Sequence, residues 1–514
     1  MSDSPPVICE YGKTPMLIET LLSQSASTDI ALLAPGRSPL SYGGLILQIE
    51  RTRAALRLYG FERHDPIALV LPNGPELASA FLSISAAGAV APLNPAYSID
   101  EFRFYMADIG AAALATLPGF CPASEQAAES LGVPVLSLSI SAIEPAGIFN
   151  IEASGRPRAR TPSKVDDRNF ALLLHSSGTT ARPKLVGLTH ANLCVSARSI
   201  AKSLRLDPED RTLNIMPLFH IHGLIGCLLS SLSAGASVYC APGFNALQFG
   251  RWLRDAGPTW YSAVPSMHQA LLGRSAEVLA NLGQPLRFIR SSSAHLETRV
   301  WRGLESSFGC PVLNAYGMTE ASHQIATNPL PPGERRYGSA GQPAGPEICI
   351  LNKSGTVQPP GHTGEIAIRG NSVIQSYVQP AEANLTAFSN GWLRTGDQGL
   401  LDADGYVSIT GRLKELINIG GEKISPAEID AVLMQHPAVH QAVTFGAKCS
   451  SRGERICSAV VLEEEATELD LKNFVRERLA RFKIPSTVLI VDEIPKGPTG
   501  KVQRIGMAGR LGLE

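Results

Sequence analysis

The stretch Phe170–Lys184 joins a short apolar run to a polar loop of the kind that holds phosphate groups. Residues 170–174 are apolar and predict a buried strand. Glycine lets a backbone come close to phosphate oxygens, hydroxyls and N–H groups donate to them, and a lysine neutralises charge. The loop supplies these groups at Ser176, Ser177, Gly178, Thr179, Thr180 and Lys184. The spacing of these residues differs from that of the G-x-x-x-x-G-K-[ST] phosphate loop. Taken alone, the segment also fits a polar surface turn.

A second group of chemically useful side chains lies in Leu313-Asn-Ala-Tyr-Gly-Met-Thr-Glu320. The ring of Tyr316 can stack on a purine, and Thr319 can donate to a phosphate. Glu320 offers the oxygen ligand that Mg²⁺ prefers when it bridges phosphates. Further along, Asp397 follows Thr-Gly and can accept hydrogen bonds from ribose hydroxyls. A strand end with a capping threonine is the simpler interpretation of the first motif, but both motifs in one chain favour a nucleotide site.

Two histidines, His220 and His222, lie two residues apart after a further apolar segment. If that backbone is extended, both side chains point to the same side and could share a ligand. A zinc site would need a third ligand at suitable spacing, and none is present, so we do not expect a metal there. The nine cysteines form no CxxC pair, which excludes a cysteine zinc site and favours a reducing compartment.

The composition limits the possible partners. A chain of 514 residues is expected to contain two or more domains. With a net charge of −1 and 44% apolar residues, it shows no sign of binding nucleic acid or a membrane surface. Its longest apolar runs are broken by Gly and Pro, so no membrane span is expected. The polar N-terminus is unlike a signal peptide, and the C-terminus lacks a peroxisomal S-K-L. We therefore expect a cytoplasmic protein.

Short apolar segments alternate with helical ones over residues 15–137, which predicts an α/β fold with doubly wound sheets. A Pro-, Gly- and Arg-rich stretch at 140–166 predicts an exposed connection. From about residue 338, alternating segments separated by Gly and Pro predict a β-rich subdomain. We assign residues 1–411 to a large N-terminal domain that includes this subdomain, and residues 412–514 to a small α+β domain.

Five motifs in order resemble those of the adenylate-forming superfamily, which includes acyl-CoA synthetases, aryl-CoA ligases and peptide-synthetase adenylation domains. They are Ser-Ser-Gly-Thr-Thr-x-x-Pro-Lys, Tyr-Gly-x-Thr-Glu, Thr-Gly-Asp, Gly-Arg-x-Lys and Pro-Thr-Gly-Lys. The resemblance covers nearly the whole chain. It implies ATP, Mg²⁺ and CoA as cofactors, activation of an acid as acyl-AMP, and transfer of the acyl group to a thiol. It also implies that the C-terminal domain is a mobile lid.

The resemblance implies roles for individual residues. Lys501 would be the catalytic lysine that bridges the carboxylate and the α-phosphate, and Glu320 would hold the metal. Thr319 would donate to the α-phosphate, and His220 would line the entrance for the acid and ATP. Lys414 would be the hinge, and the loop with Gly420 and Gly421 would serve the CoA step. Besides the phosphate loop, the nucleotide would contact Ala294, Asn314, Tyr316, Thr319, Asp397 and Arg412.

In detail the chain is similar to the oxalyl-CoA synthetases of plants and fungi, in Pro-Leu-Phe-His-Ile-His-Gly, Thr-Trp-Tyr-Ser-Ala-Val-Pro, Arg-Phe-Ile-Arg-Ser-Ser-Ser-Ala and Thr-Glu-Ala-Ser-His. A second carboxylate in the acyl pocket must find donors. The candidates are His220, Ser291, Ser293 and His323.

Two residues depart from the family pattern. Leu185 replaces a usual glycine, and His295 replaces a small residue. Because of these departures, malonate, a small hydroxy acid or an amino acid stays possible as the substrate. Two alternatives also stay open. The first is an enzyme that activates an aryl, fatty or amino acid and loads a carrier-protein thiol. The second is a non-catalytic binding protein on the same fold.

Overall fold

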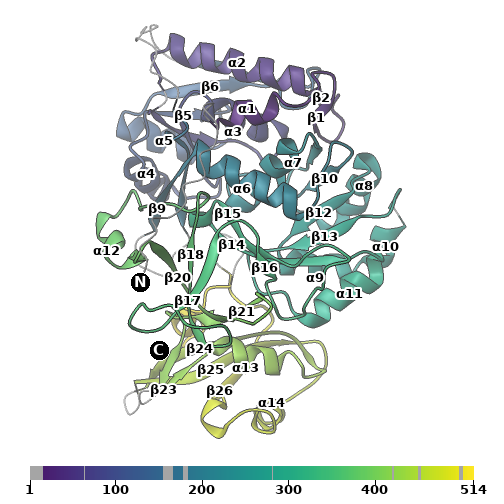
Figure 1. The fold of residues 1–514 in the computed structure, drawn as a ribbon, viewed down its shortest axis with the longest axis vertical. Helices are drawn as coiled ribbons and strands as arrows, with labels where there is room; N and C mark the ends of the chain where they lie inside the picture. The colour runs from purple at the N-terminus through teal and green to yellow at the C-terminus, as the bar shows by residue number, and fades with distance from the viewer. Residues whose placement is uncertain are drawn as a thin grey trace, which may run out of the picture.

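The computed structural model describes residues 16–62, 64–153, 166–176, 183–280, 282–419, 422–449, 453–496 and 502–513. Its strands form four sheets, and the nine-stranded sheet takes its first two strands from the chain before the seven-stranded sheet and the others from the chain after it. Figure 1 shows the two large sheets with their helices in the upper part, the C-terminal unit at the bottom and a β-rich layer between them. In this part of the chain, no helix has the length and apolar character needed to cross a membrane.

The seven-stranded sheet has the order β7-β6-β5-β3-β4-β8-β9, with a parallel centre and an antiparallel strand at each edge. This confirms the predicted doubly wound arrangement. Part of the predicted exposed connection is in fact its edge strand β7, which pairs with β6. The strands are β3 (Pro66–Val70), β4 (Ala89–Pro92), β5 (Ala113–Thr116), β6 (Val135–Ser139), β7 (Asn150–Ala153), β8 (Phe170–Ser176) and β9 (Lys184–Thr189).

The helices of this first half begin and end at recognisable signals. Ser98 caps α4 in a reciprocal capping box with Glu101, and Thr189 caps α6 in the same way with Asn192. Gly60 adopts a φ of 85° just after α2, a left-handed conformation that is common where a helix ends at glycine. The helices are α1 (Ile18–Leu22), α2 (Tyr42–Leu58), α3 (Pro75–Ser85), α4 (Ile99–Asp108), α5 (Pro122–Leu131) and α6 (His190–Ser203).

The nine-stranded sheet has the order β16-β15-β14-β13-β12-β10-β11-β1-β2, again parallel at its centre. Its strands are β1 (Ile30–Leu33), β2 (Leu40–Ser41), β10 (Arg211–Asn214), β11 (Ser237–Cys240), β12 (Trp260–Ala263), β13 (Phe288–Ser291), β14 (Val312–Met318), β15 (His323–Thr327) and β16 (Gln342–Pro343). Its helices are a π-helix η1 (His222–Leu229), α7 (Ser230–Ser233), α8 (Ala246–Ala256), α9 (Pro265–Leu272), α10 (Ser275–Leu279), α11 (Thr298–Phe308) and the 3₁₀ turn η2 (Thr319–Ala321).

The β-rich layer is a five-stranded antiparallel sheet of β17 (Glu347–Leu351), β18 (Thr363–Arg369), β19 (Phe388–Ser389), β20 (Trp392–Leu401) and β21 (Val407–Arg412), with short helices η3 (Ala381–Ala383) and α12 (Asn384–Ala387).

The C-terminal unit has a second five-stranded sheet. Its elements are β22 (Ile417–Ile419), β23 (Glu422–Ile424), α13 (Pro426–Leu433), β24 (Val439–Cys449), β25 (Gly453–Leu462), α14 (Glu468–Arg476), η4 (Arg481–Lys483), β26 (Thr487–Ile490) and α15 (Met507–Arg510). The predicted domain boundary at 411/412 stays a prediction.

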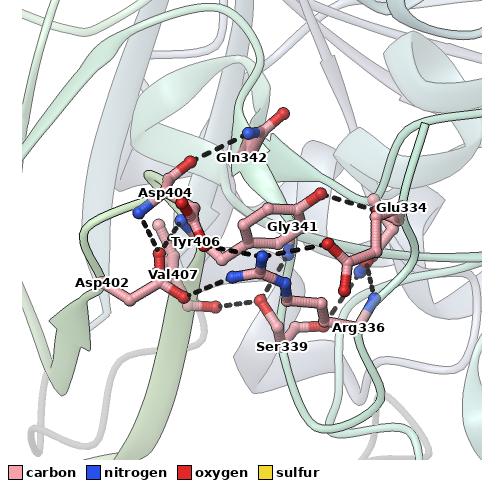
Figure 2. A network of polar contacts seen from close by, with 10 residues as sticks. Glu334, Arg336, Ser339, Gly341, Gln342, Asp402, Asp404, Tyr406 and Val407 are labelled. Atoms are coloured by element: carbon pink, nitrogen blue, oxygen red, sulfur yellow. Dashed lines mark hydrogen bonds and ion pairs between the residues drawn. The ribbon is translucent and has the colours of Figure 1, made fainter.

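A polar network attaches the β-rich layer to the nine-stranded sheet (Figure 2). Arg336 pairs with Asp402 and Asp404 at 2.8 and 2.7 Å and lies over the ring of Tyr406 at 4.0 Å. Ser339 Oγ donates to the carbonyl of Val407 at 2.8 Å. Asp402 lies in the hairpin between β20 and β21. The network thus joins the hairpin between β20 and β21 to the segment between β15 and β16.

Candidate functional site

Three residues that the motifs single out for the nucleotide lie together between two sheets. The Tyr316 hydroxyl on β14 donates to Asp397 Oδ2 on β20 at 2.5 Å. Arg412, the last residue of β21, lies opposite Asp397 in the strand register, and its Nε is 3.1 Å from Asp397 Oδ1. Tyr316 and Asp397 are buried. Asp397 lies within β20, which continues to Leu401.

Burial raises the pKa of the Asp397 carboxyl, and the charge of Arg412 and the hydrogen bond from Tyr316 oppose that rise. The carboxylate is thus compensated by two neighbours. Asn314, two residues before Tyr316, donates from Nδ2 to the carbonyl of Ser339 at 3.0 Å, and its Oδ1 has no partner in the described structure. That oxygen is a free acceptor beside the tyrosine.

Glu320 and Lys184 form the second part of this end of the site. Thr319 and Glu320 lie on η2, and the Glu320 carboxylate accepts a hydrogen bond from the Tyr377 hydroxyl at 2.9 Å. Lys184 Nζ lies 4.3 Å from the centre of the same tyrosine ring. Burial raises the pKa of the Glu320 carboxyl, while the bond from Tyr377 and the charge of Lys184 oppose the rise. The sequence motifs did not single out Tyr377.

The donor set fits a magnesium ion that arrives with phosphates. The described residues contain no cluster of three or more His, Cys, Asp or Glu side chains able to hold a metal. Glu320 is one buried carboxylate, and Mg²⁺ is commonly held by one or two carboxylates, with substrate phosphates supplying further oxygens. Glu320 can therefore hold a nucleotide-borne metal.

The phosphate loop connects two paired strands. Ser176 ends β8 and lies opposite Lys184, which begins β9. Ser177, Gly178, Thr179 and Thr180 lie outside the described residues. Leu185 forms a bridge with Gln379, in which its N–H donates to the Gln379 carbonyl at 2.7 Å. The residue that departs from the family pattern thus attaches β9 to the segment that carries Tyr377.

His222 and His323 form the centre of a polar cluster at the other end of the site. The two imidazoles stack at 4.9 Å with an interplanar angle of 20°. His222 lies 2.6 Å from Ser262 Oγ and 3.1 Å from Ser293 Oγ. His220 is half-buried in the turn that precedes η1. The predicted same-side arrangement of the two histidines is wrong, because the chain turns after Pro217 and enters a π-helix instead of extending.

Arg290 lies behind this cluster and is completely buried. Its Nη1 is 3.0 Å from His323 Nε2, and its Nη2 donates to Gln324 Oε1 at 3.0 Å. Arginine has no acceptor, so His323 Nε2 is the unprotonated nitrogen of that imidazole. Burial lowers the pKa of Arg290 to about 10, which leaves it cationic at neutral pH. No carboxylate within the described ranges pairs with it.

Other hydroxyls and backbone turns complete this end. Ser291 and Ser292 are buried, and their hydroxyls have no partner among the described atoms. Ser293 and His323 adopt φ values of 74° and 98°, which place strained turns on both sides of the cluster. A Cβ at Gly226 would come within 2.5 Å of His323 Nε2. Only a glycine on η1 leaves room for the imidazole.

The remaining predicted residues are either exposed or lie outside the described part of the chain. Ala294 and His295 are exposed just after the cluster. Lys414 is exposed and lies near enough to Lys184 that its charge contributes, after burial, to a lowered pKa of Lys184. Beside it, Glu415 accepts from Arg504 at 3.0 Å, and Arg504 also pairs with Asp430 at 2.5 Å. Lys501, Gly420 and Gly421 lie outside the described residues.

Sequence signals were available for some of the residues that the motifs missed. Arg290 stands in an apolar segment that forms a buried parallel strand, where both faces are covered. A charged residue there needs a specific partner or a ligand. No comparable local signal marks Tyr377, whose contacts come from distant segments.

Comparisons with known proteins identify the family of this chain. The family described as AMP-binding enzyme matches residues 23–378, and the AMP-binding enzyme C-terminal domain matches residues 428–501. The chain is 43% identical to an oxalate–CoA ligase of Arabidopsis thaliana, over 92% of this chain and 94% of that protein. It is 35% identical to a sulfoacetate–CoA ligase of Cupriavidus necator, over 92% and 93%.

Among solved structures, ATP-bound MatB from Rhodopseudomonas palustris superposes with a TM-score of 0.87 at 25% identity, and the match covers 98% of this chain and 99% of that one. The shared architecture confirms the predicted fold of a large α/β domain followed by a smaller C-terminal domain. The chain therefore belongs to the AMP-binding enzyme family and is an acyl-CoA synthetase of the AMP-forming type.

Proposed function

We propose that this protein is an oxalate–CoA ligase, which uses ATP to activate oxalate as oxalyl-AMP and transfers the oxalyl group to CoA. In the first step a carboxylate oxygen attacks the α-phosphate and pyrophosphate leaves. In the second step the CoA thiol displaces AMP. Bringing two anions together requires charge neutralisation and alignment.

The assignment of oxalate as the acid rests on the buried guanidinium of Arg290. It hydrogen bonds to two neutral acceptors and has no carboxylate partner within the described chain. A buried charge without a counter-charge is costly, and an anionic group beside the cluster would provide that counter-charge. The second carboxylate of oxalate is such a group, and Arg290 would act on it through His323.

The proteins named in the comparisons support an acid with two acidic groups. Oxalate has a second carboxylate, and sulfoacetate has a sulfonate besides its carboxylate. The cluster is also nearly closed, since His222 and His323 are each 2% exposed. A long acyl chain would have to displace these rings, which favours a small acid.

The remaining residues have proposed roles at the nucleotide end. Tyr316 would stack on adenine, with Ala294 and Asn314 near the base. Asp397 and Arg412 would bind the ribose, and Ser176 and Lys184 with the rest of the phosphate loop would bind the phosphates. A magnesium ion on Glu320 would neutralise phosphate charge when bound. Lys501 would contact the α-phosphate, with Lys414 as hinge and Gly420–Gly421 serving the thioester step.

The test is AMP release with ATP, Mg²⁺ and CoA across oxalate, malonate, sulfoacetate, acetate, hexanoate, benzoate and coumarate. A preference for oxalate supports the proposal. A preference for sulfoacetate or malonate would support the anion-binding role of Arg290 but would identify a different acid as the substrate. A preference for hexanoate or benzoate would contradict the role of Arg290. Acid-dependent ATP–pyrophosphate exchange without CoA turnover would favour a carrier-protein thiol, which the comparisons do not support.

A further inference from the structure

The segment 374–379 connects the two halves of the phosphate end. Ile374 N–H donates to the main-chain carbonyl of Glu320 at 2.9 Å. At its other end, Val378 N–H donates to the Leu185 carbonyl at 2.9 Å, and Leu185 N–H donates back to Gln379. The segment is thus attached both to the turn that carries the candidate metal ligand and to the strand that begins with Lys184.

Tyr377 is the most constrained residue of this segment. Its N–H donates to Asn384 Oδ1 at 2.7 Å, and its carbonyl accepts from Asn384 Nδ2 at 3.0 Å. Its side chain is buried in the main core. With both main-chain polar groups held by one amide side chain, the direction of the ring is set before any ligand binds.

The ring stands between two opposite charges. On one side the hydroxyl donates to Glu320 Oε1 at 2.9 Å, and on the other the Lys184 ammonium lies over the ring face at 4.3 Å. The second contact has the distance of a cation–π interaction. Lys184 and Glu320 form no direct ion pair in the described structure, although each lies in the field of the other.

A direct ion pair between these two side chains would work against phosphate chemistry. It would occupy the carboxylate that a metal needs and the ammonium that a phosphate needs. We propose that Tyr377 is a positioning residue that holds Glu320 and Lys184 apart and aligned, leaving Glu320 Oε2 for a divalent cation and the ammonium for a phosphate. The inference rests on the proposed nucleotide site but not on the identity of the acid.

Nucleotide binding without acid or CoA tests this role. Calorimetric titrations of the full-length protein would measure Kd for ATP with Mg²⁺ and for ATP with EDTA, and the electron paramagnetic resonance spectrum of Mn²⁺ would report the metal directly. Tyr377→Phe removes only the hydroxyl, and Tyr377→Leu also removes the ring. Tyr406→Phe is the matched control, because that buried hydroxyl donates to the carbonyl of Glu334 at 2.7 Å, in the network of Figure 2.

We expect Tyr377→Phe to weaken binding of Mg-ATP about tenfold, the scale of one hydrogen bond to a charged group. Binding of metal-free ATP should change less than about twofold, because the ring still holds Lys184. Tyr377→Leu should weaken the binding of both Mg-ATP and metal-free ATP, because Lys184 can then pair with Glu320. Tyr406→Phe should leave the binding of both nucleotide forms unchanged.

Equal weakening of both nucleotide forms by Tyr377→Phe, or no weakening of either, would overturn the inference. So would a lower Tm without a metal-specific loss, which is the result expected of a purely structural tyrosine. If Tyr377→Leu does not fold, the Phe variant decides alone. A wild-type protein that binds no Mg-ATP would instead contradict the proposed nucleotide site, so the two failures are distinguishable.

Discussion

The nucleotide end and the acid end of the site hold buried charge in opposite ways. At the nucleotide end the Asp397 carboxylate is met by Arg412 and Tyr316. At the acid end the Arg290 guanidinium meets the neutral acceptors of His323 and Gln324, and no carboxylate among the described residues pairs with it. Because an uncompensated buried charge is destabilising, the acid end is the one that an anionic ligand completes. On the proposed function, the compensated carboxylate of Asp397 would position the nucleotide, which is common to the family. The uncompensated guanidinium of Arg290 would select the acid substrate.

The largest effect should come from the lysine that would act where the two ends meet. Lys501→Ala should lower adenylation of oxalate by about 10²–10³-fold, the scale of losing one positioned group that stabilises developing charge. Thioester formation from supplied acyl-AMP should be nearly unchanged. Pyrophosphate exchange and CoA consumption would measure the two halves separately, and equal losses in both would remove Lys501 from its assigned role.

Arg290→Met should affect the acid end alone. We expect kcat/KM for oxalate to fall by about 10²-fold, since the anion loses a charge-assisted hydrogen-bond system worth about 3 kcal/mol. KM for ATP should not change. Stability should stay level or rise, because replacing a buried charge with an apolar side chain of similar size is often neutral or stabilising. A large fall in Tm with equal losses for oxalate and acetate would show that Arg290 is structural.

Asp397→Asn should affect the nucleotide end alone. The amide keeps the shape of the side chain but loses the charge opposite Arg412 and the second acceptor for ribose, so KM for ATP should rise about tenfold. The rise should be the same with oxalate, malonate or acetate as the acid, as initial rates at varied ATP would show. A rise confined to one acid would contradict the separation of the two ends.

His323→Ala should have the smallest effect and should sharpen the picture of the acid end. We expect the preference for oxalate over acetate to fall about fivefold, because the imidazole that connects Arg290 to the pocket is lost. The ratio of kcat/KM for the two acids is the measurement. Gln324→Ala is a useful companion, because it removes the other acceptor of Arg290 and should leave the ratio nearer to that of the wild type. Equal losses for both acids in His323→Ala would exclude His323 from specificity.

The nucleotide end was predictable because short contiguous motifs specify it. Tyr316 and Glu320 lie four residues apart on one strand and its following turn, so their types and order are readable in the chain. The acid end was only partly predictable. His323 and Ser293 were expected, but His222 takes the place beside them, and His220 lies in the turn before it. A π-helix and the positive φ values of Ser293 and His323 decide that geometry, and neither is visible in local patterns.

The sequence by itself determined the α/β architecture and the types and order of the residues in the nucleotide motifs. Alternating strands and helices permit few topologies, and each motif carries its own local backbone. Only the tertiary structure decided that Arg290 is buried with no carboxylate partner in the described part of the chain and that the Tyr377 ring lies between Lys184 and Glu320. These relations join segments far apart in the chain, and the cost of a buried charge depends on which neighbours packing brings to it.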